Sequence, residues 1–116
     1  MAVDSTAGKA TNLSADKVDG KDTSLWAVVD LDGTVKRSNG SASSTRNSTG
    51  FYTIVFDRDV SKCAYTATLG GSAFFFGDDG IVQVANGDTN AKAVVVRTHD
   101  LSGTPEDIPF HLVVNC

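Results

Sequence analysis

The chain closes on Pro109-Phe110-His111-Leu112-Val113-Val114-Asn115-Cys116, a short stretch in which apolar side chains recur at every second position. Side chains of a β-strand alternate between its two faces, so this spacing predicts a strand with one apolar face. That face carries Phe110, Leu112, Val114 and Cys116. The stretch therefore indicates a β-fold in which the last strand is buried on one side.

The only other cysteine opens a second run of the same kind, Cys63-Ala64-Tyr65-Thr66-Ala67-Thr68-Leu69. Each cysteine thus lies on the apolar face of its own predicted strand. We predict an intrachain disulfide between Cys63 and Cys116, because small, loop-rich exported domains use this device. In the chain-entropy model such a loop contributes about 4 kcal/mol. The alternative is that two free thiols pack as small apolar groups.

Composition limits the possible classes of protein. The chain has 116 residues and a net charge of −4, which fits one domain with an appendage and argues against a nucleic-acid partner. No apolar run has the length of a membrane span, so we expect no membrane insertion. Met1-Ala2-Val3-Asp4 lacks the basic start and apolar core of a signal peptide. We expect the sequence to be part of a longer exported protein, located outside the cell or on its surface.

Residues 1–23 differ in character from residues 24–116. The first segment has only scattered apolar side chains among Ser, Thr, Asp and Lys, too few to fold alone. It is either a flexible tail or a neck that becomes ordered beside copies of itself. From residue 24 the pattern becomes strands separated by turns, so we divide the chain into a polar N-terminal neck and a β-rich C-terminal domain.

Turn signals punctuate this second segment at short intervals. They include Asp32-Gly33, Asn39-Gly40, Asp78-Asp79-Gly80 and Asn86-Gly87-Asp88. The polar run from Ser41 to Asn47 predicts an edge strand, and no part of residues 25–116 predicts a helix. About eight short strands at this spacing predict an all-β domain, a small antiparallel sandwich or barrel-like fold.

Several predicted strands are apolar on both faces, which a small domain has few ways to bury. A subunit interface would cover the second face. The residues assigned to it are Leu25, Trp26, Val28, Phe51, Phe74, Phe75 and Phe76. The alternative is a central strand covered by loops of the same chain.

The segment Ala15-Asp16-Lys17-Val18-Asp19-Gly20-Lys21-Asp22-Thr23-Ser24 resembles a motif of bacterial tail-fibre-like and surface proteins. There it lies where a repetitive stalk meets a terminal domain. The later segments Trp26-Ala27-Val28-Val29-Asp30, Val55-Phe56-Asp57-Arg58-Asp59-Val60 and the closing stretch resemble C-terminal β-domains of bacterial collagen-like proteins. The resemblance implies an exported, non-catalytic domain that joins three chains and caps a fibrous stalk. This sequence itself contains no Gly-X-Y repeat.

Motifs of catalysis are missing from the sequence. There is no Gly-x-Ser-x-Gly elbow, no phosphate-binding glycine loop and no His-Glu-x-x-His. We place His99 in a loop and His111 in a strand, and expect surface or interface roles for both. We therefore expect no catalytic residue, no cofactor and no metal ligand. Calcium at an acidic loop on an oligomer axis stays an open alternative.

These observations lead to two hypotheses of function. The first is a homotrimerisation domain that registers and caps a collagen-like or fibrous stalk of the same chain. The second is a surface module that binds a glycan or a host protein through its loops. Exposed aromatic side chains on one loop face would favour the second.

Overall fold

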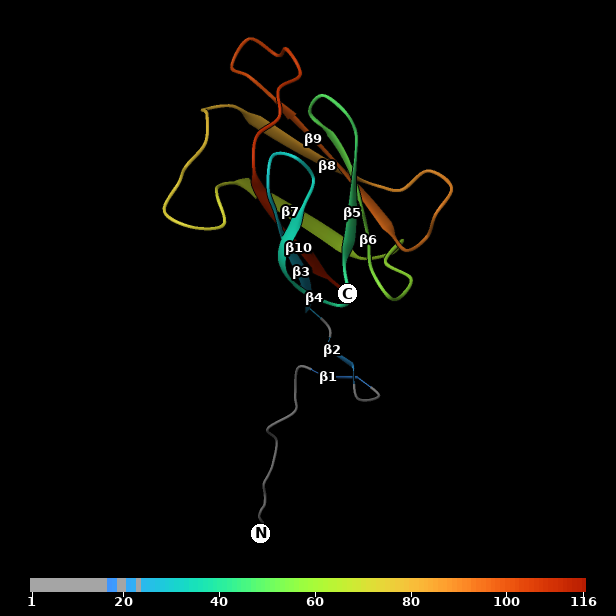
Figure 1. Cartoon of the computed structure of the whole chain (residues 1–116). Helices are drawn as coiled ribbons and strands as arrows, with labels where there is room; N and C mark the ends of the chain where they lie inside the picture. The colour runs from blue at the N-terminus through green and yellow to red at the C-terminus, as the bar shows by residue number, and fades with distance from the viewer. Residues whose placement is uncertain (1–16, 19–20, 23) are drawn as a thin grey trace.

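Two four-stranded antiparallel sheets pack face to face in the computed structural model, which describes residues 17–18, 21–22 and 24–116 (Figure 1). In chain order the strands are β1 (Lys17–Val18), β2 (Lys21–Asp22), β3 (Ser24–Val29), β4 (Val35–Asn39), β5 (Ser43–Ser48), β6 (Phe51–Val55), β7 (Ala64–Leu69), β8 (Ile81–Asn86), β9 (Ala93–His99) and β10 (Phe110–Asn115). The described residues contain no helix, and the prediction of an all-β sandwich is confirmed.

The first sheet has the order β4-β3-β10-β7, and the second has the order β5-β6-β9-β8. Strands β1 and β2 pair only with each other. Most of the predicted neck, residues 1–23, lies outside the described residues. The predicted C-terminal domain begins where β3 does, at Ser24.

Strand β10 lies inside the first sheet, between β3 and β7. Its residue Asn115 is opposite Ser24 on one side and Ala64 on the other. At its other end, Phe110 is opposite Leu69 of β7. The start of β3 and the end of β10 therefore lie at one end of the sandwich, which we call the neck end (Figure 1). The opposite end, beyond Phe110, is called the far end.

Apolar side chains at alternate positions of the strands fill the space between the two sheets. The core residues are Leu25, Ala27, Val29, Tyr52, Ile54, Phe56, Val60, Val94, Val96, Phe110, Leu112 and Val114. The rings of Tyr52 and Phe110 meet edge to face, with centroids 5.1 Å apart, and join the two sheets. Burying each large side chain contributes about 1.5–3 kcal/mol, so this layer is the main source of stability.

The predicted disulfide between Cys63 and Cys116 is present. Asn115 and Ala64 are the last pair of the β10–β7 ladder, so the two cysteines are the next opposed pair. Their Cα atoms are 4.4 Å apart. This matches the separation of about 4.5 Å in a non-hydrogen-bonded antiparallel pair, so the bond fits the existing strand geometry.

Phe74, Phe75 and Phe76, which we counted among the predicted strands with two apolar faces, do not form a strand. These residues form a loop between β7 and β8, and we call residues 70–80 the aromatic loop. The backbone N–H of Phe75 donates to the carbonyl oxygen of Ala73 at 2.7 Å, a tight turn that no extended strand makes. Gly77 follows in the left-handed region, at φ 74°, and turns the chain again.

The hairpin at Asp32-Gly33 is present but longer than a two-residue turn. The Asp30 N–H donates to the Thr34 carbonyl, and the Gly33 N–H donates to the Asp30 carbonyl. Gly33 has φ 91°, which gives a three-residue loop closed by a left-handed residue.

The polar run after Asn39-Gly40 forms the edge strand that its composition predicts. Strand β5 ends the order of the second sheet and pairs only with β6. Its exposed Ser, Thr, Arg and Asn side chains face solvent, as expected of an edge strand without a second partner strand.

Replacing both cysteines, Cys63→Ser with Cys116→Ser, is expected to lower the free energy of unfolding by about 4 kcal/mol. The cross-link limits the unfolded chain while leaving the β7–β10 ladder of the native state intact. Urea unfolding followed by circular dichroism measures the difference, with reduced wild type as the control. An unchanged unfolding midpoint would show that the bond adds nothing to stability.

Candidate interaction surfaces

The carboxylate of Asp107 is the centre of a polar network that ties together loops at the far end. Its Oδ1 atom accepts a hydrogen bond from the Gly50 N–H at 2.7 Å, and its Oδ2 atom accepts one from Nε of Arg46 at 2.8 Å. The Tyr52 hydroxyl donates to the Leu31 carbonyl at 2.8 Å and lies 3.3 Å from Oδ1 of Asp107. The network thus fixes the β3–β4 turn, strand β5, the β5–β6 turn and the segment before β10.

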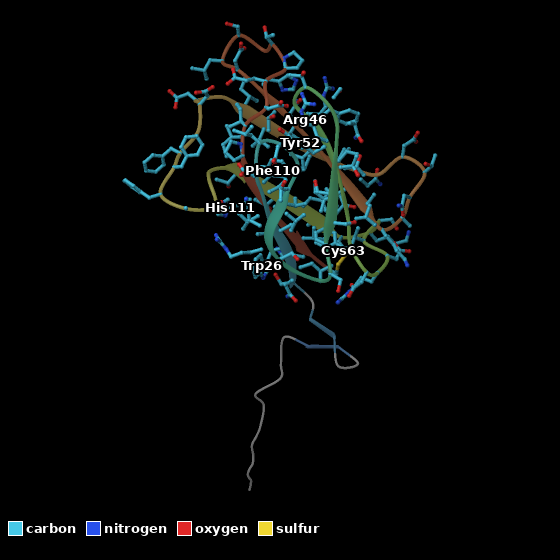
Figure 2. All side chains as sticks on the ribbon, viewed as in Figure 1. Trp26, Arg46, Tyr52, Cys63, Phe110 and His111 are labelled. Atoms are coloured by element: carbon cyan, nitrogen blue, oxygen red, sulfur yellow. A yellow bond between two sulfur atoms is a disulfide. The ribbon has the colours of Figure 1, made fainter. Side chains whose placement is uncertain are left out.

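Tyr52 is the fully buried member of this network. Burial, followed by the negative charge of Asp107, raises the pKa of its hydroxyl far above the ordinary value of 10.0. A phenol held neutral and hydrogen-bonded beneath the surface has a structural role, because no substrate can reach it. Figure 2 shows Tyr52 close to Arg46 and Phe110 inside the fold.

The raised pKa of Tyr52 makes stability depend on alkaline pH. The unfolded chain releases this proton near pH 10.0, before the native protein does, so stability is intact below that pH and falls above it. We expect Tyr52→Phe to cost about 0.5–1.5 kcal/mol at neutral pH and to weaken the alkaline loss. Melting temperatures of both proteins from pH 7 to 11 measure this. Burial also raises the pKa of Tyr65, so the Tyr52→Phe variant is expected to keep part of the alkaline loss of stability. Identical alkaline slopes would contradict the assignment.

Gly50, which donates to Asp107, has φ 66° and no room for a side chain. A Cβ atom there would collide with the Thr98 carbonyl oxygen and with the backbone of Glu106. Gly103 is a matched control, because it has φ 87° but nothing within 4 Å of a built Cβ. We expect Gly103→Ala to cost about 1–2 kcal/mol from backbone strain, and Gly50→Ala to cost distinctly more. Urea unfolding of the two variants measures the difference, and equal costs would exclude the steric effect.

The two histidines both lie on strands, in different surroundings. His99 ends strand β9 and is buried, so its placement in a loop is wrong. His111 lies on β10 as predicted, and its Nε2 atom is 2.9 Å from the Gly71 carbonyl oxygen. Within residues 17–18, 21–22 and 24–116, no three His, Cys, Asp or Glu side chains are grouped to hold a metal ion.

The outer face of the first sheet carries an exposed apolar pair. Trp26 of β3 is directly opposite Val113 of β10, and the exposed fractions are 37% and 36%. The pair lies toward the neck end, where Figure 2 labels Trp26. We call Trp26 and Val113 the tryptophan patch.

Val28 is on the same outer face but is buried by the chain itself. It is opposite Arg37 on one side and His111 on the other. Nη1 of Arg37 donates to the Ser72 carbonyl at 2.8 Å, so both neighbours reach the backbone at the base of the aromatic loop. The base of the aromatic loop therefore lies over this part of the sheet and is anchored to it by Arg37 and His111. For Val28 the structure thus favours a strand covered by a loop of the same chain over a subunit interface.

The remaining predicted interface residues do not form one surface. Leu25 is fully buried in the core, so its side chain cannot contact a partner. The assignment of Leu25 to a subunit interface is therefore corrected. Phe51 is half-buried on the outer face of the second sheet, opposite Arg97. Trp26 lies on the other side of the sandwich. On a strand with two apolar faces, the period of two does not tell which face is the core.

The three phenylalanines of the aromatic loop are the most exposed large apolar group in the described part of the chain. Phe74 is 93% exposed, Phe75 56% and Phe76 75%. The rings of Phe74 and Phe76 contact each other, with centroids 5.5 Å apart. In Figure 1 the loop between β7 and β8 projects from the body of the sandwich. The fold leaves these rings uncovered, so they are available to a partner.

An open hollow of about 470 Å³ adjoins this loop at the far end. We call it the end hollow, and its lining residues are Leu69, Phe76, Asp78, Asp79, Gly80 and Leu101. Glu106 adds a further carboxyl group beside that of Asp78. The interaction with Asp78 first, and burial and nearby negative charges next, raise the pKa of Glu106.

Sequence reasoning missed a repeat that shapes this end of the molecule. The pattern Asp-Leu-x-Gly-Thr occurs at residues 30–34 and again at residues 100–104. Both copies form the same turn, with the Asp N–H donating to the Thr carbonyl and the Gly N–H donating to the Asp carbonyl. The repeat places Leu31 and Leu101 at the tips of two turns, and it is readable from the sequence alone.

No known protein family, curated protein or solved structure matches this chain. Among the described residues, no helix has the length and apolar character needed to cross a membrane.

Proposed function

We propose that this chain is a non-catalytic, homotrimeric oligomerisation domain that registers and caps a collagen-like or fibrous stalk of an exported bacterial protein. The observation that carries the proposal is apolar surface left over from a finished core. The tryptophan patch stays exposed although twelve core residues already close the space between the sheets. Exposed apolar groups on a rigid sandwich favour association with another chain.

The position of the tryptophan patch supports a role in joining chains. It lies on β3 and β10 toward the end where the neck enters the domain. In a threefold assembly the same patch of each chain meets around one axis, which would bring three necks together. Chains held in this way no longer need a bimolecular encounter to align, so a stalk winds in register.

The disulfide is consistent with a location outside the cell, because such bonds persist in oxidising compartments. It also fixes the strand that carries Val113, since β10 ends one residue before Cys116. A covalently anchored β10 keeps the tryptophan patch rigid, which lowers the entropic cost of association.

Multi-angle light scattering of the purified chain at micromolar concentration is expected to give the mass of three chains. Trp26→Ser is expected to dissociate the assembly, because burial of each large side chain contributes about 1.5–3 kcal/mol and a trimer repeats it. Leu31→Ser is the control, because the exposed fraction of Leu31, 39%, is similar to the 37% of Trp26, whereas Leu31 lies at the far end. A wild-type monomer, or equal dissociation by both variants, would refute the proposal.

A second candidate function is a surface binding module that recognises a glycan or a host protein through its loops. The location of Phe74-Phe75-Phe76 in an exposed loop favours it, because aromatic side chains on a loop are common binding anchors. The two functions use opposite ends of the domain and can coexist in one molecule.

A further inference from the structure

The end hollow combines apolar and acidic groups in one depression. Leu69, Phe76 and Leu101 form its apolar part, and Leu101 is 71% exposed. Asp78 and Asp79 line the same space, and the carboxyl group of Glu106 lies near Asp78. None of its lining residues is Lys or Arg.

The carboxylates of the hollow differ from those elsewhere at this end. Asp107 is paired with Arg46, and Asp100 accepts the backbone N–H groups of Ser102 and Thr104. Asp78 instead meets another carboxyl group, that of Glu106. Two neighbouring acids repel one another when ionised, and a cationic side chain placed between them would relieve that repulsion.

From this combination we propose that the end hollow binds a partner polypeptide segment in which a Lys or Arg side chain lies next to an apolar side chain. The apolar side chain packs on Leu101 and Phe76, and the cation meets the carboxylates of Asp78 and Asp79. The inference rests on the binding-module candidate and gives it a site and a class of ligand. It does not depend on the trimer.

Hydrogen bonds hold the base of the aromatic loop and the turn that carries Leu101 before any partner arrives. Gly71 and Ser72, at the base of the aromatic loop, are bonded by His111 and Arg37. The opposite wall is the turn at residues 100–104, closed by two backbone hydrogen bonds. Preorganised walls reduce the ordering cost of binding, so a short segment could bind measurably.

Charge disfavours the competing occupants. The neck of a second copy, residues 1–23, contains Lys17 beside Val18, but its four Asp outnumber its three Lys and the whole chain has a net charge of −4, so a second copy complements an acidic hollow less well than a basic segment does. Nucleic acid and anionic lipid would be repelled for the same reason. A segment with positive charge and apolar side chains satisfies both halves of the site.

Fluorescence anisotropy with labelled synthetic peptides tests the proposal. The first peptide alternates Lys and Leu, the second replaces each Lys with Glu, and the third replaces each Leu with Ser. We expect saturable binding of the first and much weaker binding of the other two. No saturable binding of the first peptide, or equal binding of all three, would overturn the proposal.

Variants of the chain assign the binding to the hollow. We expect Leu101→Ser to weaken binding of the Lys–Leu peptide about tenfold, from lost apolar contact. Asp79→Asn is expected to weaken it about two- to fivefold, as for a partly exposed ion pair. Asp88→Asn is the matched control, because Asp88 is an exposed acid outside the hollow, and no change is expected. Equal effects of Asp79→Asn and Asp88→Asn would overturn the site.

Two further measurements separate the proposals. Light scattering of Leu101→Ser and Asp79→Asn is expected to show the wild-type mass, so loss of peptide binding without dissociation concerns the hollow alone. Flotation with neutral phosphatidylcholine vesicles tests a lipid surface. Flotation that Leu101→Ser abolishes, together with no preference for the Lys–Leu peptide, would overturn the peptide assignment in favour of lipid.

Discussion

The pairing of β10 between β3 and β7 is the constraint on which the rest of the structure depends. These ladders join residues 110–115 to residues 24–29 and 64–69, so the first sheet exists only when distant parts of the chain meet. The disulfide lies one pair beyond the β10–β7 ladder. A slip of one residue would separate the cysteines and turn Phe110 and Leu112 out of the core. The bond is therefore compatible with this register of β7 and β10 and not with one shifted by a residue.

Sequence patterns predicted the parts of the fold in which apolar and polar residues alternate. The face shared by Phe110, Leu112 and Val114 gave β10 correctly, and the two cysteines on such faces gave the disulfide. Alternation failed where it was absent. The three consecutive phenylalanines carry no period, so their loop could not be told from a strand. Likewise the Asp107 network joins residues that are far apart in sequence, and no local pattern predicts it.

The repeated turn shows how far a local motif determines a role. At both sites Asp-Leu-x-Gly-Thr gives the same closed loop, because Gly supplies the left-handed residue that the turn requires. In the first copy the Leu31 carbonyl accepts the Tyr52 hydroxyl, which draws the turn onto the second sheet. In the second copy Leu101 stands at the hollow with 71% of its surface exposed. The motif fixes the backbone, and the neighbouring elements decide whether the turn is tied to a sheet, as at Leu31, or leaves its leucine largely exposed, as at Leu101.

The sheet edges bear on how the domain could associate. On one side of the sandwich the edge strands β4 and β5 carry Lys36, Arg37 and Arg46, and charged edges resist the addition of a foreign strand. On the other side β7 and β8 carry no charged residue, but these two edges contact each other across the sandwich. With one pair of edges charged and the other pair mutually covered, backbone pairing is a poor route to assembly. The exposed apolar side chains on the sheet face and on the aromatic loop are then the better candidates for contact with another chain. This favours association governed by the identity of Trp26 and the loop phenylalanines over association governed by strand hydrogen bonds.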